Sequence, residues 1–266
     1  MQMSERRHVI DGEEAIAKDY GLVYTCNLGW LDLGHMNPTS SRPHTGASSL
    51  WKEINAGGPD VRQCLGTHRQ ICTQPSNTHR FPAVTFADGK TTGFKLIYLQ
   101  DMQKRKFSMT VSSGIKREYI IRHDLSISER KSVALAIFME VSLEFEAYQE
   151  FFPKFITDSG FSQEDLVSNL IGFHIAVGTV TKSQVLAMAK PVSKTTALSI
   201  WDRNGSVGSN KNRGFKPLFS PDTWAITDKA CVDECAGIVP RAPEFLSSIT
   251  PAKKGELFMN NVLGSS

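Results

Sequence analysis

Residues 126–152, SISERKSVALAIFMEVSLEFEAYQEFF, decide the fold that we expect for this chain. Ser126 and Glu129 have the Ser-x-x-Glu spacing of a capping box, which marks a helix N-terminus. Pro153 marks the end of the helix, because proline cannot continue it. Apolar residues recur at helical spacing on two nearly opposite sides, which indicates a central, buried helix. One stripe holds Val133, Ile137, Val141, Phe145, Tyr148 and Phe152, and the other holds Leu135, Met139 and Leu143.

Three glutamates, Glu140, Glu144 and Glu146, lie inside this apolar helix. A buried carboxylate is costly unless it is paired, and burial raises its pKa, so that it can serve as a protonated general acid near neutral pH. Glu140 follows the apolar run VALAIFM, so we expect it to be the most desolvated and the best candidate for the acid. Glu146 is the second catalytic candidate, and Glu144, one turn after Glu140, is a candidate for substrate binding. The alternative is that all three line a solvated edge of the helix.

The segments around this helix predict an α+β fold, because the strands come before the helices and do not alternate with them. We expect an antiparallel sheet packed on the helix, with strands at 82–87, 93–102, 106–113 and 116–125 and turns at Asp88-Gly89 and Ser113-Gly114. The other expected elements are a strand at 21–27 and helices at about 1–20, 49–56, from 162 and at 182–190, with loops at 57–80 and beyond 200. We treat residues 1–266 as one domain with a core at about 21–190 and a loop-rich extension at about 200–266.

The composition is that of a globular chain, with 266 residues, 40% of them hydrophobic, and a formal net charge of +3. This weak positive charge fits an acidic polymer as a partner, but no arginine-rich run or aromatic RNA-binding signature supports nucleic acid. No apolar run of about 18 residues predicts a transmembrane segment, and the N-terminus lacks the apolar core of a signal peptide. We therefore expect synthesis in the cytoplasm and, if the protein acts outside it, delivery by another machine or as a domain of a longer chain.

The five cysteines, an odd number, leave at least one thiol free if none is modified. Cys231 can pair with Cys235, one helical turn away, and Cys64 can pair with Cys72 across a loop. The spacing alone establishes neither disulfide. The CxxC spacings of a four-cysteine zinc site are absent, as are HExxH, GxSxG, P-loop and GxGxxG motifs, so we expect no cofactor and no resident metal.

A second group of candidates lies in GWLDLGHMNP, residues 29–38, where Asp32 and His35 follow a strand in a glycine-flanked loop. Asp32 can orient His35, which can then act as base, acid or metal ligand, whereas the alternative is a tight turn with a capping histidine. Trp30, in the same element, is a candidate for substrate contact. Cys26 and His35 can be combined as a thiol–imidazole pair, although a cysteine inside an apolar strand is usually inert.

The third group lies in SQEDLVSN, residues 162–169. Ser162 is placed to cap a helix, and Asp165 complements the helix dipole. Asp165, Ser168 and Asn169 are candidates for substrate binding, but Ser168 and Asn169 can equally bond the neighbouring backbone.

Together these motifs resemble an uncharacterised family of bacterial envelope-associated proteins, many of them predicted lipoproteins. The family's Gly-aromatic-Ile/Leu-Asp-x-x-His element reads here GWLDLGH, and its Ser-x-Glu-Asp-Leu-x-Ser-Asn-Leu-Leu-Gly element reads SQEDLVSNLIG. Its Tyr-Glu-Leu-Ser…Trp-His-Glu helix corresponds to MEVS, residues 139–142, followed by Phe145 and Glu146. The similarity covers about residues 21–178. Phe145 stands where the family has histidine, which argues against a metal site on this helix.

The resemblance implies that Asp32, His35, Glu140, Glu146 and Asp165 form one site acting on peptidoglycan or a related envelope glycan. Helix-borne glutamates then favour a lysozyme-like glycosidase, in which a protonated carboxyl donates to the leaving oxygen. The missing signal peptide fits an antibacterial toxin domain delivered to the periplasm by a secretion apparatus, with an immunity protein as a candidate partner. Two alternatives stay open: an amidase or peptidase that uses His35 and Asp32 with a metal or Cys26, and a non-catalytic envelope-binding module.

Overall fold

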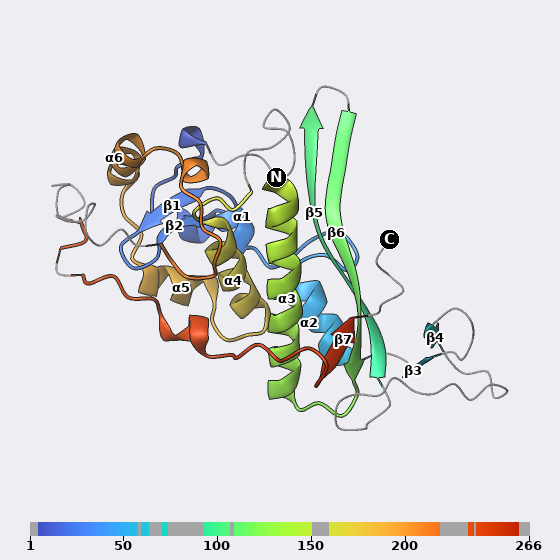
Figure 1. Cartoon of the computed structure of the whole chain (residues 1–266). Coiled ribbons are helices and arrows are strands. Elements are labelled where there is room, and N and C mark those ends of the chain that lie inside the picture. Colours follow the sequence, from blue (N-terminus) through green and yellow to red (C-terminus); the bar gives the residue numbers. More distant parts are fainter. Residues whose placement is uncertain are drawn as a thin grey trace. The chain divides into compact units, whose positions relative to one another are not determined.

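The computed structural model confirms a mixed α+β fold (Figure 1). It describes residues 5–57, 60–63, 71–73, 93–106, 109–150, 160–218, 234–236 and 238–260. Two compact units divide the chain: unit 1 comprises Met1–Pro38 and Ser142–Ser248, and unit 2 comprises Thr39–Val141 and Ile249–Ser266. The expectation that residues 1–266 form a single domain stays a prediction. In the described part, no helix is long and apolar enough to cross a membrane.

Unit 1 combines a small hairpin with helices. Strands β1 (Leu22–Thr25) and β2 (Gly29–Asp32) pair antiparallel and lead directly into the short helix α1 (Leu33–Met36). The longer helices are α4 (Asp165–Ala176), α5 (Lys182–Ala189) and α6 (Lys194–Asn204). Four 3-10 turns complete the described part: η1 (Arg6–His8), η2 (Ala15–Ala17), η3 (Val207–Ser209) and η4 (Glu244–Ser247). The expected helix over the first 20 residues is wrong, because residues 5–20, the described part of this segment, form only η1 and η2.

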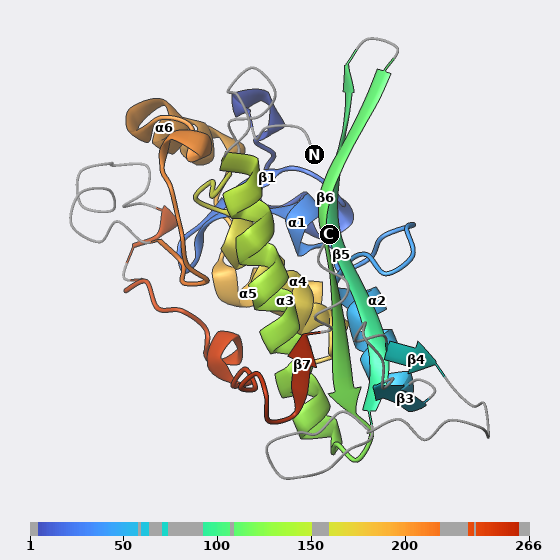
Figure 2. The ribbon, with the colours of Figure 1, turned by 45° about the vertical axis from the view of Figure 1, so that its right-hand side comes forward.

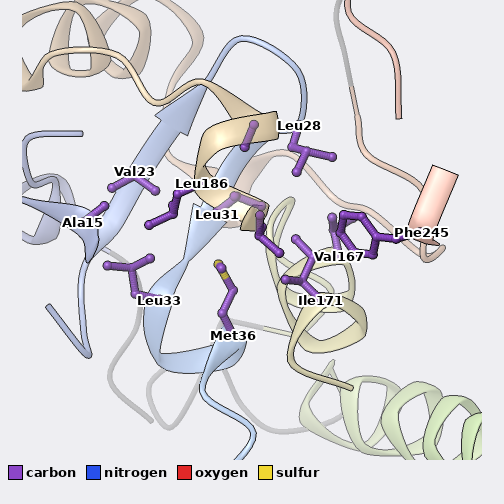
Figure 3. Packing of buried hydrophobic residues seen from close by; sticks show 12 residues of the cluster. Ala15, Val23, Leu28, Leu31, Leu33, Met36, Val167, Ile171, Leu186 and Phe245 are labelled. Atoms are coloured by element: carbon purple, nitrogen blue, oxygen red, sulfur yellow. The ribbon is translucent and has the colours of Figure 1, made fainter. Parts of the chain in front are cut away.

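The core of unit 1 joins the hairpin to α4 and α5. Figure 3 shows Leu31 and Met36 packed with Val167 and Ile171 of α4 and with Phe245 of η4. All five side chains are at least nine-tenths buried, which on transfer estimates stabilises the fold by about 1.5–3 kcal/mol for each large apolar side chain. This packing fixes the short helix α1 against α4.

Unit 2 contains helix α2 (Ala47–Ala56) and a five-stranded antiparallel sheet with the order β4-β3-β5-β6-β7. The strands are β3 (Asp60–Gln63), β4 (Ile71–Thr73), β5 (Gly93–Lys106), β6 (Met109–Arg122) and β7 (Phe258–Asn260). Figure 2 shows β5 and β6 as a long hairpin, with β3 and β4 at the end where β5 begins. The predicted turn at Ser113-Gly114 is wrong: both residues pair within the ladder, opposite Met102 and Asp101, so β6 is one strand. The expected strand at 82–87 and the turn at Asp88-Gly89 lie outside the described residues.

Helix α3 (Ile127–Glu150) confirms the central helix. The backbone N–H of Ser126 donates to Glu129 Oε2 at 2.8 Å, and the N–H of Glu129 donates to Ser126 Oγ at 3.3 Å, which completes the predicted capping box. Val133, Ile137, Val141 and Phe145 are buried as expected, whereas Tyr148 is 38% exposed and Phe152 lies outside the described residues. The boundary between the two units falls inside α3, between Val141 and Ser142.

A disulfide joins Cys26, which follows β1, to Cys235, with a Cα–Cα distance of 5.5 Å. Cys235 is therefore not paired with Cys231, which the spacing had left possible, and Cys26 carries no free thiol for a pair with His35. Beside the disulfide, the Glu234 carboxylate accepts hydrogen bonds from the N–H and Oγ of Ser193, which caps α6. Covalent and polar contacts together tie the 234–236 segment to β1 and α6. Cys64 lies outside the described residues, so the Cys64–Cys72 pairing is not tested.

Candidate functional site

The Asp32–His35 element begins the site, because the first turn of α1 sets the direction of both side chains. Asp32 Oδ1 accepts hydrogen bonds from the N–H groups of Gly34 at 2.6 Å and His35 at 3.3 Å, so Asp32 is the N-cap of α1. The backbone N–H of Asp32 donates to Ser168 Oγ of α4 at 2.9 Å. Asp32 therefore orients His35 through the backbone. Ser168 has a structural role, because it holds the Asp32 backbone against α4.

Gly172 allows α1 and α4 to approach each other closely. A Cβ at this position would lie 3.0 Å from the carbonyl oxygens of both His35 and Met36, which is tighter than an ordinary van der Waals contact. The last glycine of the SQEDLVSNLIG element is thus required for packing, because only a residue without a side chain lets the His35 backbone lie directly on α4.

His35 and Asp165 meet in the interior. His35 Nδ1 lies 3.5 Å from Asp165 Oδ1, and their side chains are only 3% and 7% exposed. Burial lowers the pKa of the His35 imidazole, against the opposing effect of the Asp32 charge. Burial also raises the pKa of the Asp165 carboxyl well above its usual value. A neutral imidazole beside a protonated carboxyl is the state that these two directions favour.

Glu146 lies in the last two turns of α3 and is fully buried. Its Oε2 accepts a hydrogen bond from the N–H of Phe161 at 2.8 Å, and in the described part of the chain its Oε1 has no hydrogen-bond partner. Phe161 has a φ of 57°, which is uncommon for a residue other than glycine and costs conformational energy. Lys211 Nζ donates to the carbonyl of Gly160 at 2.8 Å, and the Phe161 carbonyl accepts from the N–H of Asn212 at 2.9 Å. These bonds hold the strained turn against the end of α3.

Burial raises the pKa of Glu146 to about 7, against smaller opposing effects of the Phe161 hydrogen bond and the Lys211 charge. For Asp165, burial is again the main cause, and the neighbouring charges of Glu146, Glu164 and Asp32 add to it. Glu164, which precedes α4, is itself fully buried. Glu146 and Asp165 therefore keep protons at a pH where ordinary carboxyls have lost them. Together with the buried Glu164 they form what we call the buried acid cluster.

Glu140 is not the desolvated acid that we expected. It belongs to unit 2, where its Oε1 forms an ion pair with Lys254 Nζ at 2.7 Å, and its side chain remains 22% exposed. Lys254 comes from a segment 114 residues further along the chain, so no local pattern could reveal it. Burial and the shifted pKa make Glu146 the better acid, and Glu144 lies half-buried between the two.

Trp30 and Asn169 are two further residues that we expected to contact the substrate. Trp30 is 3% exposed and makes edge-to-face contacts with Tyr24 and Trp201, with ring centroids 5.3 and 5.7 Å away. It is a core residue without an open ring face for a sugar. Asn169, half-buried on α4, has no hydrogen-bond partner for Nδ2 within the described ranges.

The site thus unites Asp32, His35, Glu146, Asp165 and Ser168 within unit 1, while Glu140 stands in unit 2. Two further buried residues of this site, Glu164 and Ser142, are not among the candidates that the sequence predicts. Ser142 is four residues before Glu146, and this spacing was the available signal, because it places both on one helix face. Across the residues that the structure describes, no three His, Cys, Asp or Glu side chains form a metal-binding group.

The chain matches no family model, no curated protein and no solved structure. The resemblance to envelope-associated proteins therefore rests on its three motifs alone, and the functional argument rests on the chemistry of the buried acid cluster.

The raised pKa of Glu146 predicts that the protein is less stable at alkaline pH. The folded state holds the Glu146 proton more tightly than the unfolded state, whose pKa is near 4.5. The resulting stabilisation is complete at acidic pH and is lost as the pH rises through about 7. From pH 5 to 8 we expect this group to remove up to about 3 kcal/mol from the free energy of unfolding, measured by urea denaturation.

Glu146→Gln should reduce this pH dependence by that amount, because glutamine does not titrate, whereas the raised pKa of Asp165 continues to contribute. Glu150→Gln is the matched control, since Glu150 pairs with Arg213 at the exposed end of the same helix. A dependence that is undiminished in Glu146→Gln would show that other groups cause it.

Proposed function

We propose that the chain is a hydrolase of peptidoglycan or a related envelope glycan, with Glu146 as its general acid. One observation carries this proposal: Glu146 is a buried carboxyl with a pKa near 7, one oxygen held by Phe161 and the other without a partner in the described part. A glycosidase needs a carboxyl that is still protonated at neutral pH and has an oxygen free to donate to the leaving group. We propose Oε1 of Glu146 as that donor, and because the side chain is fully buried, the substrate must displace the residues that cover it.

In this proposal the surrounding residues support the acid. Oε2 is fixed by the Phe161 amide, so the proton is directed to Oε1. The charges of Glu146, Glu164 and Asp32 raise the pKa of Asp165, so Asp165 stays protonated beside the acid. Asp32, half-buried at the start of α1, is the candidate for the second carboxylate that stabilises positive charge on the sugar or positions water. An acid carried by a long helix in a protein with small antiparallel sheets also favours a lysozyme-like arrangement, which is an analogy only.

The disulfide supports action in the periplasm or cell envelope, because disulfides persist in oxidising compartments and are rare in the cytosol. The motif resemblance points to the same compartment. We further propose that the protein reaches it as a delivered antibacterial domain, by a secretion apparatus and with a matching immunity protein.

An amidase or peptidase that uses the Cys26 thiol as its nucleophile is excluded, because Cys26 is bonded to Cys235. Its metal form would have to use His35, whose buried Nδ1 faces Asp165. The third alternative, a non-catalytic binding module, is separated from both enzymes by the experiment below.

Digestion of purified peptidoglycan tests the proposal, with products separated as muropeptides. We expect new reducing sugar ends, which mark glycosidic cleavage. New free amines without reducing ends would replace the glycosidase with an amidase or peptidase. Binding to the polymer in a sedimentation assay, with neither product formed, would leave a binding module.

A further inference from the structure

Two carboxyls from different elements bind neighbouring amides of one turn. The N–H of Phe161 donates to Glu146 Oε2 at 2.8 Å, and the N–H of Ser162 donates to Asp165 Oδ2 at 3.2 Å. Phe161 is left-handed, and successive N–H groups around such a residue point to a common side and form a concavity that attracts negative charge. The carboxyls of α3 and α4 therefore converge on the same side of this turn.

Both carboxyls are shielded from water, with Glu146 0% and Asp165 5% exposed. Two carboxylates that share a dry site repel each other, so both ionise together only well above neutral pH. Other charged groups act on the pair from each neighbouring element: Lys211 after η3, Glu164 before α4 and Asp32 at α1. His35 of α1 contacts Asp165 directly. Glu150, further along α3, is paired with Arg213.

Ser142 supplies an independent observation on the same helix face. It is fully buried, one turn before Glu146, and its Oγ has no hydrogen-bond partner among the described residues. A buried hydroxyl without a partner is costly, and such groups often mark a place that a ligand or water occupies. The protonated Oε1 of Glu146 offers a donor to such a ligand, and Ser142 Oγ offers a donor or an acceptor.

We propose that Glu146 and Asp165 work as one acid pair that holds a single proton at neutral pH, and that Glu146 Oε1 and Ser142 Oγ meet the ligand's oxygen. Asp165 is a positioning residue, since it acts through Glu146. When the pair donates, the O–H bond of Glu146 breaks as an O–H bond forms on the leaving oxygen. The pair then holds two negative charges and takes a proton back from water. The identity of the ligand rests on the proposed function, whereas the proton sharing does not.

Carbon-13 NMR titration of the aspartate and glutamate carboxyls tests the pair without any substrate. Glu146→Gln should lower the titration midpoint of Asp165 by about one pH unit or more, because Asp165 then loses its proton without the neighbouring Glu146 charge. Asp165→Asn should move the midpoint of Glu146 less, because Asp165 still holds its proton when Glu146 titrates near 7. Asp202→Asn, in an exposed pair with Arg6, is the matched control and should leave both midpoints unchanged.

An Asp165 midpoint that stays unchanged in Glu146→Gln would overturn the acid pair. If Glu146→Gln does not fold, the wild-type protein decides: each carboxyl of a coupled pair shows two titration steps, whereas an independent carboxyl shows one. Coupling without cleavage of peptidoglycan would remove the proposed function alone. Cleavage without coupling would remove the acid pair alone.

Discussion

Glu146→Gln should reduce the cleavage of purified peptidoglycan by about 10²–10⁴-fold, the usual contribution of a general acid. Glutamine keeps the volume of the side chain, and its Oε1 can still accept the hydrogen bond from Phe161, but an amide cannot donate the acid proton. Because the substitution also removes a buried titratable group, we expect the variant to stay folded. The measurement is the rate at which reducing ends appear, with circular dichroism as the test of folding.

Two variants on the same helix make this result specific. Glu150→Gln removes an exposed carboxylate that pairs with Arg213, and Glu140→Gln removes the partner of Lys254. Both should keep most of the activity, since neither carboxyl is buried. A folded Glu146→Gln protein with full activity would contradict the assignment of the acid, and loss of activity in Glu140→Gln alone would return the role to that residue.

Cys235→Ser should lower the free energy of unfolding by about 2–5 kcal/mol, the range found when a native disulfide is removed from a small domain. The bond connects residues that are 209 positions apart, so its loss frees a long loop in the unfolded chain. Chemical denaturation of the oxidised and reduced protein measures the effect, and a dithiol reductant should reproduce the substitution.

The double variant Cys26→Ser/Cys235→Ser provides the control, because it should be no less stable than either single variant if these two residues form the bond. Peptide mapping under non-reducing conditions should recover a fragment that contains both cysteines. Recovery of a Cys231–Cys235 fragment in its place would contradict the connectivity.

Local patterns predicted the elements whose determinants are close in sequence. The capping box of Ser126 and Glu129 and the apolar spacing located α3, because both act within a few residues. The same reasoning missed α6, although Ser193 caps it by accepting from the N–H of Thr196. It also placed a turn at Ser113-Gly114, where ladder pairing with β5 overrides the turn preference of the dipeptide.

The candidate site was predictable only as a set of residue types. The helix pattern indicated that a glutamate would be buried, but the choice among three depended on distant partners. Lys254 pairs with Glu140, whereas the turn at Phe161 encloses Glu146. Contacts of this kind depend on tertiary structure, as does the pairing of Cys26 with Cys235.

The position of the unit boundary inside α3 has a consequence for dissecting the protein. Each unit is assembled from separated stretches of chain, with Thr39–Val141 of unit 2 inserted between the two stretches of unit 1. A simple truncation therefore cannot yield either unit intact. Genetic dissection would require excising the insertion or joining new ends by circular permutation, and a cut at Val141 would divide one continuous helix between two fragments. Recombination between related genes would meet the same obstacle, so the two units are expected to be inherited together.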